Sequence, residues 1–418
     1  MIIFIIFILA FFIMVFRDPL WGVLFYIAST ILRFQDYIPS LSSLRIPLFI
    51  MICTLIIMLV KGKMRSKFDN KLKYLLLFVG LCCLSSIFSG QSFSKLFNFF
   101  LPKFFLSFMI YQVIDTEEQI KNFLVVFYLL LFYLAAMLFH SYYVGSNYFY
   151  YWIYERPYGR GFMEDPNELS LWMNSGFIFS IIFVMMFSKK IIHRCFFLGG
   201  GLLSGFGTVL CNSRSGMIGF ILGTGLIYTI SEKKHKIIVL ILLAVMTAGI
   251  LSHAGSRFWY RMDMIDGRDT SGKIEGSASE RLNSWKNGID LLFENPFFGV
   301  GALNIMNHNF RVTYDGLLEG RVLHSGVIEV MAENGILGSL LWYLMILLSI
   351  KDLLIYRFIK DVDGHHNMRM GSIIFLCCCA PLFVNSVFLS NQYNIFLFVL
   401  FGFSSAIKKY YLTIIHEL

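Results

Sequence analysis

Charged residues are scarce in this chain. Asp, Glu, Lys and Arg make up 15% of its 418 residues, whereas a soluble protein of this length carries about a quarter. Hydrophobic residues account for 57%, and apolar runs of membrane-spanning length recur along the chain. One or two signal peptides could not explain so many runs. The composition therefore excludes ordinary soluble domains and indicates a polytopic integral membrane protein.

The sequence also lacks CxxC cysteine pairs and the features of a cleaved signal peptide. No CxxC pair exists, and the eight cysteines fall in or at the ends of apolar runs. We therefore expect neither a disulfide framework nor a zinc site, and we interpret the cysteines as small core residues of buried helices. The N-terminus has no basic region and no small-residue cleavage site, so we expect it to be retained.

Thirteen apolar segments approach the length of a membrane span. The first two are separated only by Arg17-Asp18-Pro19, so they form either two spans or one broken helix. The predicted fold class is all-α, with 12–13 transmembrane helices: about nine or ten in 1–252, a long polar segment at 253–325, and C-terminal transmembrane helices in 326–418. The segments are 1–16, 20–32, 46–60, 74–89, 96–114, 122–141, 169–187, 195–212, 215–231, 237–252, 326–350, 370–390 and 393–407.

Basic residues crowd five connections between these segments. All five fall on one side, which the positive-inside rule makes cytoplasmic, so most of the net charge of +9 is loop charge and not a sign of nucleic-acid binding. They lie at 61–73, 189–194, 233–236, 351–369 and 408–409. With Lys121 and Arg17 also placed inside, the cytoplasmic side carries 15 Lys and 5 Arg, whereas the rest of the chain carries 4 Lys and 11 Arg. Arginine suits bidentate phosphate recognition, but it also pairs with carboxylates in folded loops, so both interpretations of the outer arginines stand.

The outer segment 253–325 contains an amphipathic helix. Apolar residues repeat at 3-4-3 spacing after Glu280, and the stripe would lie on the membrane surface or against the spans. Ser277 or Ser279 could cap this helix, and Asn295-Pro296 ends it. Residues 263–279 are interpreted as a mobile loop and a possible lid. The apolar residues of the stripe are Leu282, Trp285, Ile289 and Leu292.

Three residues at the outer membrane boundary could carry chemistry. Arg214 lies in the shortest turn between two spans, where an arginine is costly without an anionic partner, either a substrate or a lipid headgroup. Arg281 opens the amphipathic helix, where an ion pair with Glu280 or Asp290 is the alternative. His324 stands where the segment re-enters the membrane. A lone histidine there is usually only an interfacial residue, but near two arginines a neutral histidine can act as a general base on a hydroxyl.

The other outer connection, 142–168, is rich in tyrosine. Its aromatic residues could form an interfacial belt, which we favour, or a platform on which sugars stack. Asp165 and Asn167, on either side of a proline, are expected to cap the following helix, and no ligand spacing supports a metal site. Glycines in 199–207 and at Gly219 and Gly223 indicate close helix packing.

Four motifs in order resemble the bacterial O-antigen ligase and O-antigen polymerase superfamily. The resemblance covers residues 150–345, and the hydropathy extends it to most of the chain. Many relatives have His-Asn where this chain has His324-Ser325. The motifs are Arg-x2-Gly-x-Gly-x3-Asp-Pro-Asn from Arg156, Ser-Arg-Ser-Gly from Ser213, Arg-x3-Trp from Arg281 with Asn-Pro-Phe-Phe-Gly-Val-Gly, and His-Ser-x3-Glu-x3-Glu-x-Gly-x2-Gly from His324.

The resemblance implies a glycosyltransferase of the bacterial inner membrane that uses an undecaprenyl-diphosphate-linked glycan on the periplasmic face, without a cofactor or metal. The family's diphosphate-binding arginines map to Arg214 and Arg281, and its proposed base maps to His324. Arg156 and Arg160 are weaker candidates for the same binding role or for holding the glycan. The acceptor would be a hydroxyl of lipid A-core, of a growing glycan or of a protein, and a base opposite the diphosphate favours inversion at the anomeric carbon.

Three alternatives remain open at this point. A repeat-unit polymerase would share the chemistry, and we prefer the ligase only because the helix-bearing loop before His324 resembles that branch. A transporter of lipid-linked glycans would need charges lining a path through several spans, whereas Lys103 is the one clear basic residue within a span. A structural scaffold would tolerate the loss of His324.

Overall fold

The computed structural model describes residues 11–33, 45–65, 68–145, 151–153, 156–159, 164–187, 190–264, 268, 276–312, 318–358 and 365–417. Within these residues, eight helices are long and apolar enough to cross a membrane. They confirm the predicted all-α polytopic membrane fold. These helices are α4 (Asn70–Phe88), α5 (Phe93–Val113), α6 (Glu117–Val144), α7 (Pro166–Ile182, continued by the π-helix η4, Phe183–Phe187), α10 (Lys233–His253), α13 (Gly326–Leu353), α14 (His366–Phe388) and α15 (Ile395–Glu417).

Four further helices match expected segments. Three are apolar but shorter, namely α2 (Leu20–Leu32), α3 (Ile46–Val60) and α9 (Arg214–Ile230), and the fourth is α8 (Ile191–Leu210). The twelve segments expected after residue 19 therefore each coincide with a helix. The first segment, 1–16, lies mostly outside the described residues. A helical stretch over 11–17 ends just before Asp18, whose carboxylate accepts the N–H of Leu20 at 3.0 Å.

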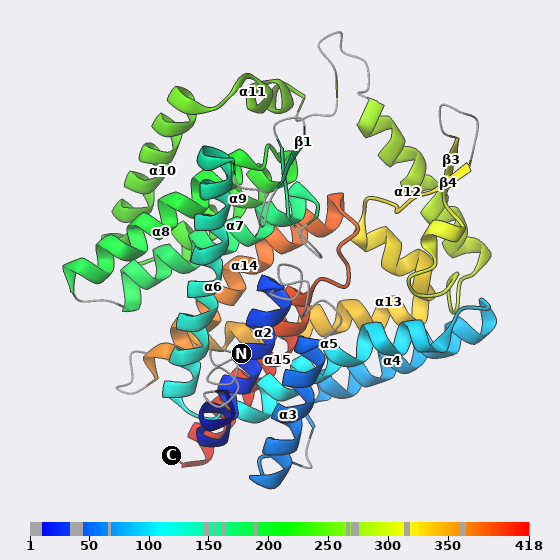
Figure 1. Ribbon diagram of the computed structural model, residues 1–418, viewed down its shortest axis with the longest axis horizontal. Helices are drawn as coiled ribbons and strands as arrows, with labels where there is room; N and C mark the ends of the chain where they lie inside the picture. The colour runs from blue at the N-terminus through cyan, green and yellow to red at the C-terminus, as the bar shows by residue number, and fades with distance from the viewer. Residues whose placement is uncertain are drawn as a thin grey trace.

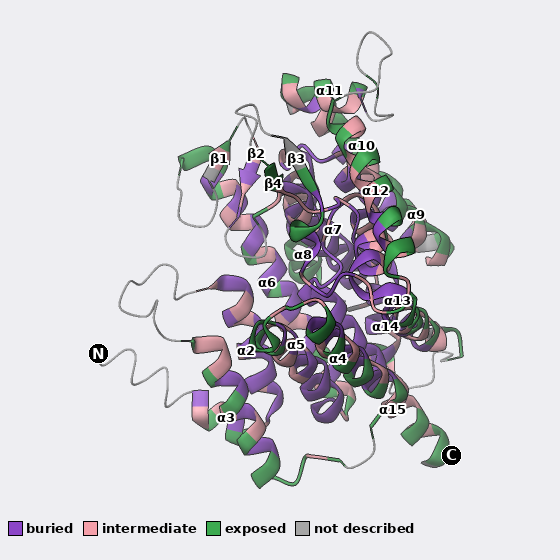
Figure 2. Cartoon of the chain, turned by 90° about the vertical axis from the view of Figure 1, so that its right-hand side faces the viewer, coloured by how far each residue is buried: buried purple, intermediate pink, exposed green. Residues whose placement is uncertain are grey.

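Helix α7 is the centre of the bundle. It packs against α6, α8, α9 and α14, and nearly every one of its residues is buried (Figure 2). A helix that is apolar all round is buried on all sides, which fits its lack of an amphipathic pattern. Glycines permit the close contacts around it, as predicted: a Cβ at Gly219 would lie 3.0 Å from Pro381 of α14, and one at Gly207 would lie 2.7 Å from Met173 of α7.

Basic residues from two predicted cytoplasmic connections meet at one end of the bundle. The amino groups of Lys63 and Lys409 lie 3.7 and 2.8 Å from the Asp115 carboxylate, and Arg65 lies 2.9 Å from it. The assignment of Lys71 to a loop was wrong. It belongs to α4, is almost fully buried, and pairs with Asp352 of α13 at 2.7 Å, because desolvated charges in a bundle need a partner.

The opposite end carries the extramembrane elements (Figure 1). These are the short helices α11 (Ser256–Asp263) and η5 (Ile305–Asn307), the helix α12 (Gly276–Glu294) and two hairpins. In the first hairpin β1 (Tyr151–Ile153) pairs with β2 (Arg156–Tyr158), and in the second β3 (Phe310–Val312) pairs with β4 (Leu318–Gly320). The short helix η6 (Leu354–Arg357) lies apart from these elements and directly follows α13. The hairpins and α11 were not predicted.

Helix α12 agrees in part with the predicted amphipathic helix. It ends at Glu294, before Asn295-Pro296, as expected, but it begins at Gly276. Ser277 and Ser279 therefore lie inside the helix, and the prediction that one of them caps it was wrong. The helix packs on α13 through Gly288 and Leu291, while Leu282 and Ile289 of the predicted stripe remain exposed in the isolated chain. The predicted lid, 263–279, lies largely outside the described residues.

Helix α13 is broken at Gly335, and a glycine turn at Gly299–Gly301 packs against the break. Gly335 has a φ of 61°, outside the helical region, and the amides of Val300 and Gly301 bond to the carbonyls of Ala332 and Glu333 at 2.9 Å each. A Cβ at Gly299 would lie 2.3 Å from the carbonyl carbon of Glu333, so only glycine fits there. The turn thus satisfies carbonyls that the break exposes, and it fixes the first half of α13, whose N-terminus follows His324.

Candidate active site

Arg214 is placed by a tight connection between α8 and α9. Asn212 adopts a left-handed conformation with a φ of 49°, and Ser213 caps α9 by accepting the N–H of Gly216 at 3.0 Å. Arg214 is the first residue of the helix. Its guanidinium donates to the carbonyl of Met264 at 2.6 Å and to the hydroxyl of Ser277 at 3.4 Å. The side chain therefore points toward α11 and α12, at the end of the bundle opposite the lysine-rich connections (Figure 1).

His324 is held at the start of α13 by a similar arrangement. Its φ is 56°, and the following Ser325 caps the helix by accepting the N–H of Ile328 at 3.4 Å. A left-handed conformation is rare for a residue with a Cβ and persists only where the surroundings impose it. The backbone N–H of His324 donates to the hydroxyl of Ser390 at 3.0 Å.

The buried carboxylate of Glu329 ties this segment to the loop between α14 and α15. It accepts hydrogen bonds from the N–H of Leu323 at 3.0 Å, from the amide of Gln392 at 2.7 Å, and from the hydroxyl of Ser390. The second glutamate of the motif, Glu333, accepts from Tyr393 at 3.0 Å. Glu329 therefore supports the backbone around His324, whereas Glu333 is bound by Tyr393 and by the N–H of Ile305.

The surroundings of His324 favour its neutral form. Burial and the positive charges of Arg281 and Arg321 lower its pKa below the ordinary value, and Asp165 and Glu280 oppose this shift. At neutral pH the imidazole is uncharged and one ring nitrogen can accept a proton. Arg281, in the second turn of α12, is thus close enough to act on the histidine. Its predicted alternative partner Glu280 forms an ion pair with Arg321 at 2.5 Å.

Arg156 lies beside the same site. Its guanidinium donates to the carbonyl of Cys211 at 3.4 Å and to the side chain of Asn167 at 3.3 Å. Asn167 also accepts from the Ser213 hydroxyl at 2.7 Å, while Asp165 caps α7 by accepting the Asn167 N–H at 2.6 Å. The prediction of a cap at Asp165 is confirmed, and Asn167 instead joins the first hairpin to the start of α9. Arg160 lies outside the described residues.

Two arginines of α11 complete a cluster that the sequence did not reveal. Burial and the positive charges of Arg156, Arg214, Arg257 and Arg281 lower the pKa of Arg261 to about 10. Arg261 is therefore within electrostatic range of four other guanidinium groups. Among the described residues, its buried Nε finds no hydrogen-bond partner. The spacing of Arg257 and Arg261 by four residues, which puts both on one face of a helix, was the available signal.

Five guanidinium groups gathered at one place repel one another unless an anion joins them. The starts of α9 and α13 lie in the same region, and helix N-termini carry partial positive charge. The site can therefore stabilise a multiply charged anion at the membrane boundary, beside a neutral histidine that can accept a proton.

Residues 199–343 match a family model described as O-antigen ligase. This match supports membership of the chain in the O-antigen ligase and polymerase superfamily. A comparison with curated proteins gives no match. The matched region contains Arg214, Arg281 and His324 together with Arg257 and Arg261. Arg156 precedes the matched region, and the structure brings it to the site through the hairpin and Asn167.

Proposed function

We propose that this protein transfers a glycan from undecaprenyl diphosphate to an acceptor hydroxyl on the periplasmic side of the inner membrane. Membership in the superfamily supports a membrane enzyme that acts on lipid-linked glycans. The observation that carries the proposal is the position of a half-buried, neutral His324 beside Arg281 and the arginine cluster. The cluster lies at the end of the bundle opposite the lysine-rich connections, which supports the periplasmic assignment.

In the proposed reaction the acceptor hydroxyl oxygen attacks the anomeric carbon of the donor. As the new C–O bond forms, His324 takes the hydroxyl proton on a ring nitrogen. The bond between the anomeric carbon and the diphosphate oxygen breaks, and its electron pair leaves with the diphosphate. Attack from the side opposite the leaving group inverts the configuration at that carbon.

The arginines stabilise the leaving diphosphate. Arg214 and Arg281 would form paired hydrogen bonds to its oxygens, and they are held in place before the reaction by α9 and α12. Arg156 would contact the phosphate or the first sugar. Because these donors are preorganised, no nucleotide, metal or other cofactor is required by the proposed step. The charge that develops on the diphosphate is met directly by the guanidinium groups.

A ligase that acts on lipid A-core or on a protein is the preferred form of this function, and a repeat-unit polymerase is the alternative. A helix, α12, stands in the loop before His324 and carries Arg281, which is the feature that favours the ligase. A transporter is less well supported. Lys103 contacts the carbonyl of Tyr393 at 2.9 Å and the ring of Phe99 at 3.3 Å, and Lys71 pairs with Asp352, so both lysines are engaged by protein groups.

The experiment is an analysis of glycans in the native host that carries His324→Ala. Loss of a ligase leaves long polymer on undecaprenyl diphosphate, whereas loss of a polymerase leaves acceptor with a single repeat. His308→Ala, which removes another outer histidine that is exposed, serves as the matched control. Surface glycan identical to that of the wild type would remove His324 from the mechanism and favour a scaffold.

A further inference from the structure

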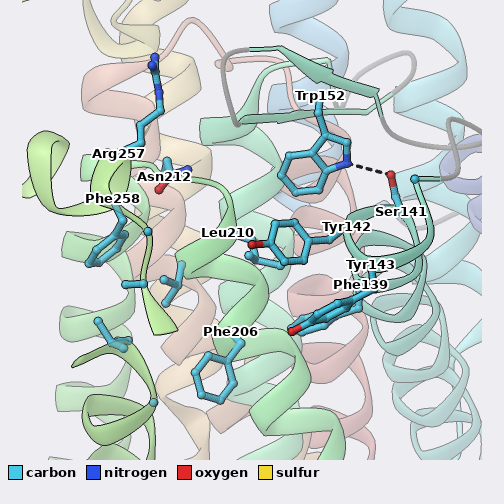
Figure 3. A pocket seen from close by; sticks show the side chains of 16 residues that line it. Phe139, Ser141, Tyr142, Tyr143, Trp152, Phe206, Leu210, Asn212, Arg257 and Phe258 are labelled. Atoms are coloured by element: carbon cyan, nitrogen blue, oxygen red, sulfur yellow. Dashed lines mark hydrogen bonds between the residues drawn. The ribbon is translucent and has the colours of Figure 1, made fainter. Parts of the chain in front are cut away.

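An apolar cavity of about 830 Å³ adjoins the arginine cluster. Its size falls within the range of small-molecule binding pockets. Helices α6, α8, α10 and α11 and the strand β1 form its walls (Figure 3). The principal lining side chains are Phe139, Tyr142, Trp152, Phe206, Ile250 and Phe258.

The walls of the cavity are better suited to hydrocarbon than to sugar. Trp152 and Tyr142 lie on one side and Phe258 on the other, with Phe206 deeper in the cavity (Figure 3). The indole N–H of Trp152 already donates to Ser141 at 3.0 Å, so this wall offers the ring face and not a donor. Most of the lining surface is apolar, and a hydrocarbon chain has no hydroxyl of its own that needs a partner there.

Charge begins where the apolar cavity ends. Asn212 and Arg257 are the polar residues at its outer rim, and Arg257 extends from the upper end of the cavity in Figure 3. Asn212 stands two residues before Arg214, and Arg257 stands one helical turn before Arg261. The cavity and the arginine cluster thus share a rim. A molecule that joins a hydrocarbon chain to a phosphate group is complementary to both.

The cavity is also placed for entry from the bilayer. Helix α10, which forms one wall, packs mainly on α8 and α9, and its outward side chains Leu240, Ile241 and Leu251 are exposed. Peripheral apolar helices of this kind face lipid. A lipid chain could therefore leave the cavity beside α10 without crossing the core of the protein.

We propose that this cavity binds the phosphate-proximal isoprene units of a polyprenyl diphosphate, and that Arg257 and Arg261 bind its diphosphate. The inference rests on the proposed function, because it identifies the occupant as the lipid carrier of the donor. It adds to that function a lipid site and two arginines that no motif indicated. The glycan would then extend from the cluster toward His324.

The test measures binding of undecaprenyl diphosphate to the purified full chain, with inorganic diphosphate as a second probe. Ile250→Trp fills the cavity with an apolar side chain, and Leu251→Trp adds the same group to the exposed face of α10 as the matched control. We expect Ile250→Trp to weaken binding of the lipid at least tenfold and to leave binding of inorganic diphosphate unchanged. Leu251→Trp should bind both like the wild type. Arg261→Gln should weaken both probes at least tenfold.

Several results would overturn the inference. These are unchanged lipid binding in Ile250→Trp, an equal loss for both probes in that variant when it elutes as a single folded species, or equal competition by vesicles of phosphatidylglycerol. The last would make the cavity a site for ordinary lipid. The proposed function is tested separately, because binding of the lipid needs no turnover. If Ile250→Trp loses lipid binding but His324→Ala still transfers glycan, the lipid site is supported. The catalytic role of His324 is then refuted.

Discussion

The hydroxyl of Ser390 accepts the backbone N–H of His324 at 3.0 Å, although the two residues are 66 positions apart in the chain. The same hydroxyl donates to the carboxylate of Glu329, which also accepts the N–H of Leu323. The left-handed backbone of His324 is therefore held by the loop that joins α14 to α15. This relationship makes Ser390 a positioning residue for the proposed base.

Removal of the Ser390 hydroxyl should displace the histidine. Ser390→Ala leaves the half-buried N–H of His324 without its acceptor, at a cost of about 1 kcal/mol in folding stability. We expect kcat for glycan transfer to fall about tenfold while KM for the donor stays unchanged, because the lost group acts on geometry and not on binding. Ser390→Thr keeps the hydroxyl and should restore activity. Ser386→Ala, in the last turn of α14, is the control, and an equal loss in both alanine variants would refute the positioning role.

Replacement of Arg321 should change the pH dependence of transfer. The base must be neutral, so activity falls as the pH drops through the pKa of His324, which burial, Arg281 and Arg321 hold below its ordinary value. Arg321→Gln removes one positive charge and leaves Glu280 without its ion-pair partner. Both changes raise the pKa, so the acidic limb of kcat/KM should move to higher pH. Lys286→Gln removes an exposed charge from α12 and should leave the profile unchanged. A fixed acidic limb in Arg321→Gln would contradict the assignment of the base.

Substitution of Arg214 by lysine should abolish most activity although the charge is kept. The guanidinium spans the carbonyl of Met264 and the hydroxyl of Ser277, and a lysine cannot reproduce its planar pair of donors. Loss of one preorganised donor typically costs about 10²–10³ in kcat. The measurement is transfer by the purified protein, with Arg194→Lys, an exposed arginine at the start of α8, as the control. Transfer at the wild-type rate in Arg214→Lys would argue against bidentate binding of the diphosphate.

The glycine turn against α13 should tolerate no side chain. Gly299 has a φ of 66°, and a Cβ there would overlap the carbonyl of Glu333. We expect Gly299→Ala to lower the free energy of unfolding by more than about 3 kcal/mol. Gly90→Ala is a matched control, because Gly90 has a φ of 68° but open space around it, and it should cost only about 1–2 kcal/mol. Thermal unfolding of both variants checks the difference, and equal losses would mean that the contact with α13 contributes nothing.

Much of this architecture could be predicted because its causes are local. The spans are recognisable from apolar length alone, and Asp165 is recognisable as a cap from the proline that follows it. Arg214 and His324 could be selected because each stands at a membrane boundary, directly beside the serine that caps the next helix. The order of the motifs then pointed to the superfamily.

The rest of the site depends on contacts between distant segments. Arg257 and Arg261 become part of it only because α11 folds back over the start of α9, and a 3-4 pattern cannot show where a short helix will pack. Ser390 is the last residue of the expected span 370–390, where nothing in the sequence shows that its hydroxyl meets the backbone of His324. Lys71 was taken for loop charge because the sequence does not reveal that Asp352 lies opposite it in α13.

The most direct test of the catalytic account is the rate of glycan transfer by the purified His324→Ala protein in liposomes that contain the lipid-linked donor. Because a general base typically contributes about 10²–10⁴-fold, we predict a fall in kcat of at least 100-fold with donor binding unchanged. His308→Ala should transfer at the wild-type rate. Transfer by His324→Ala within a few-fold of the wild type would contradict the account.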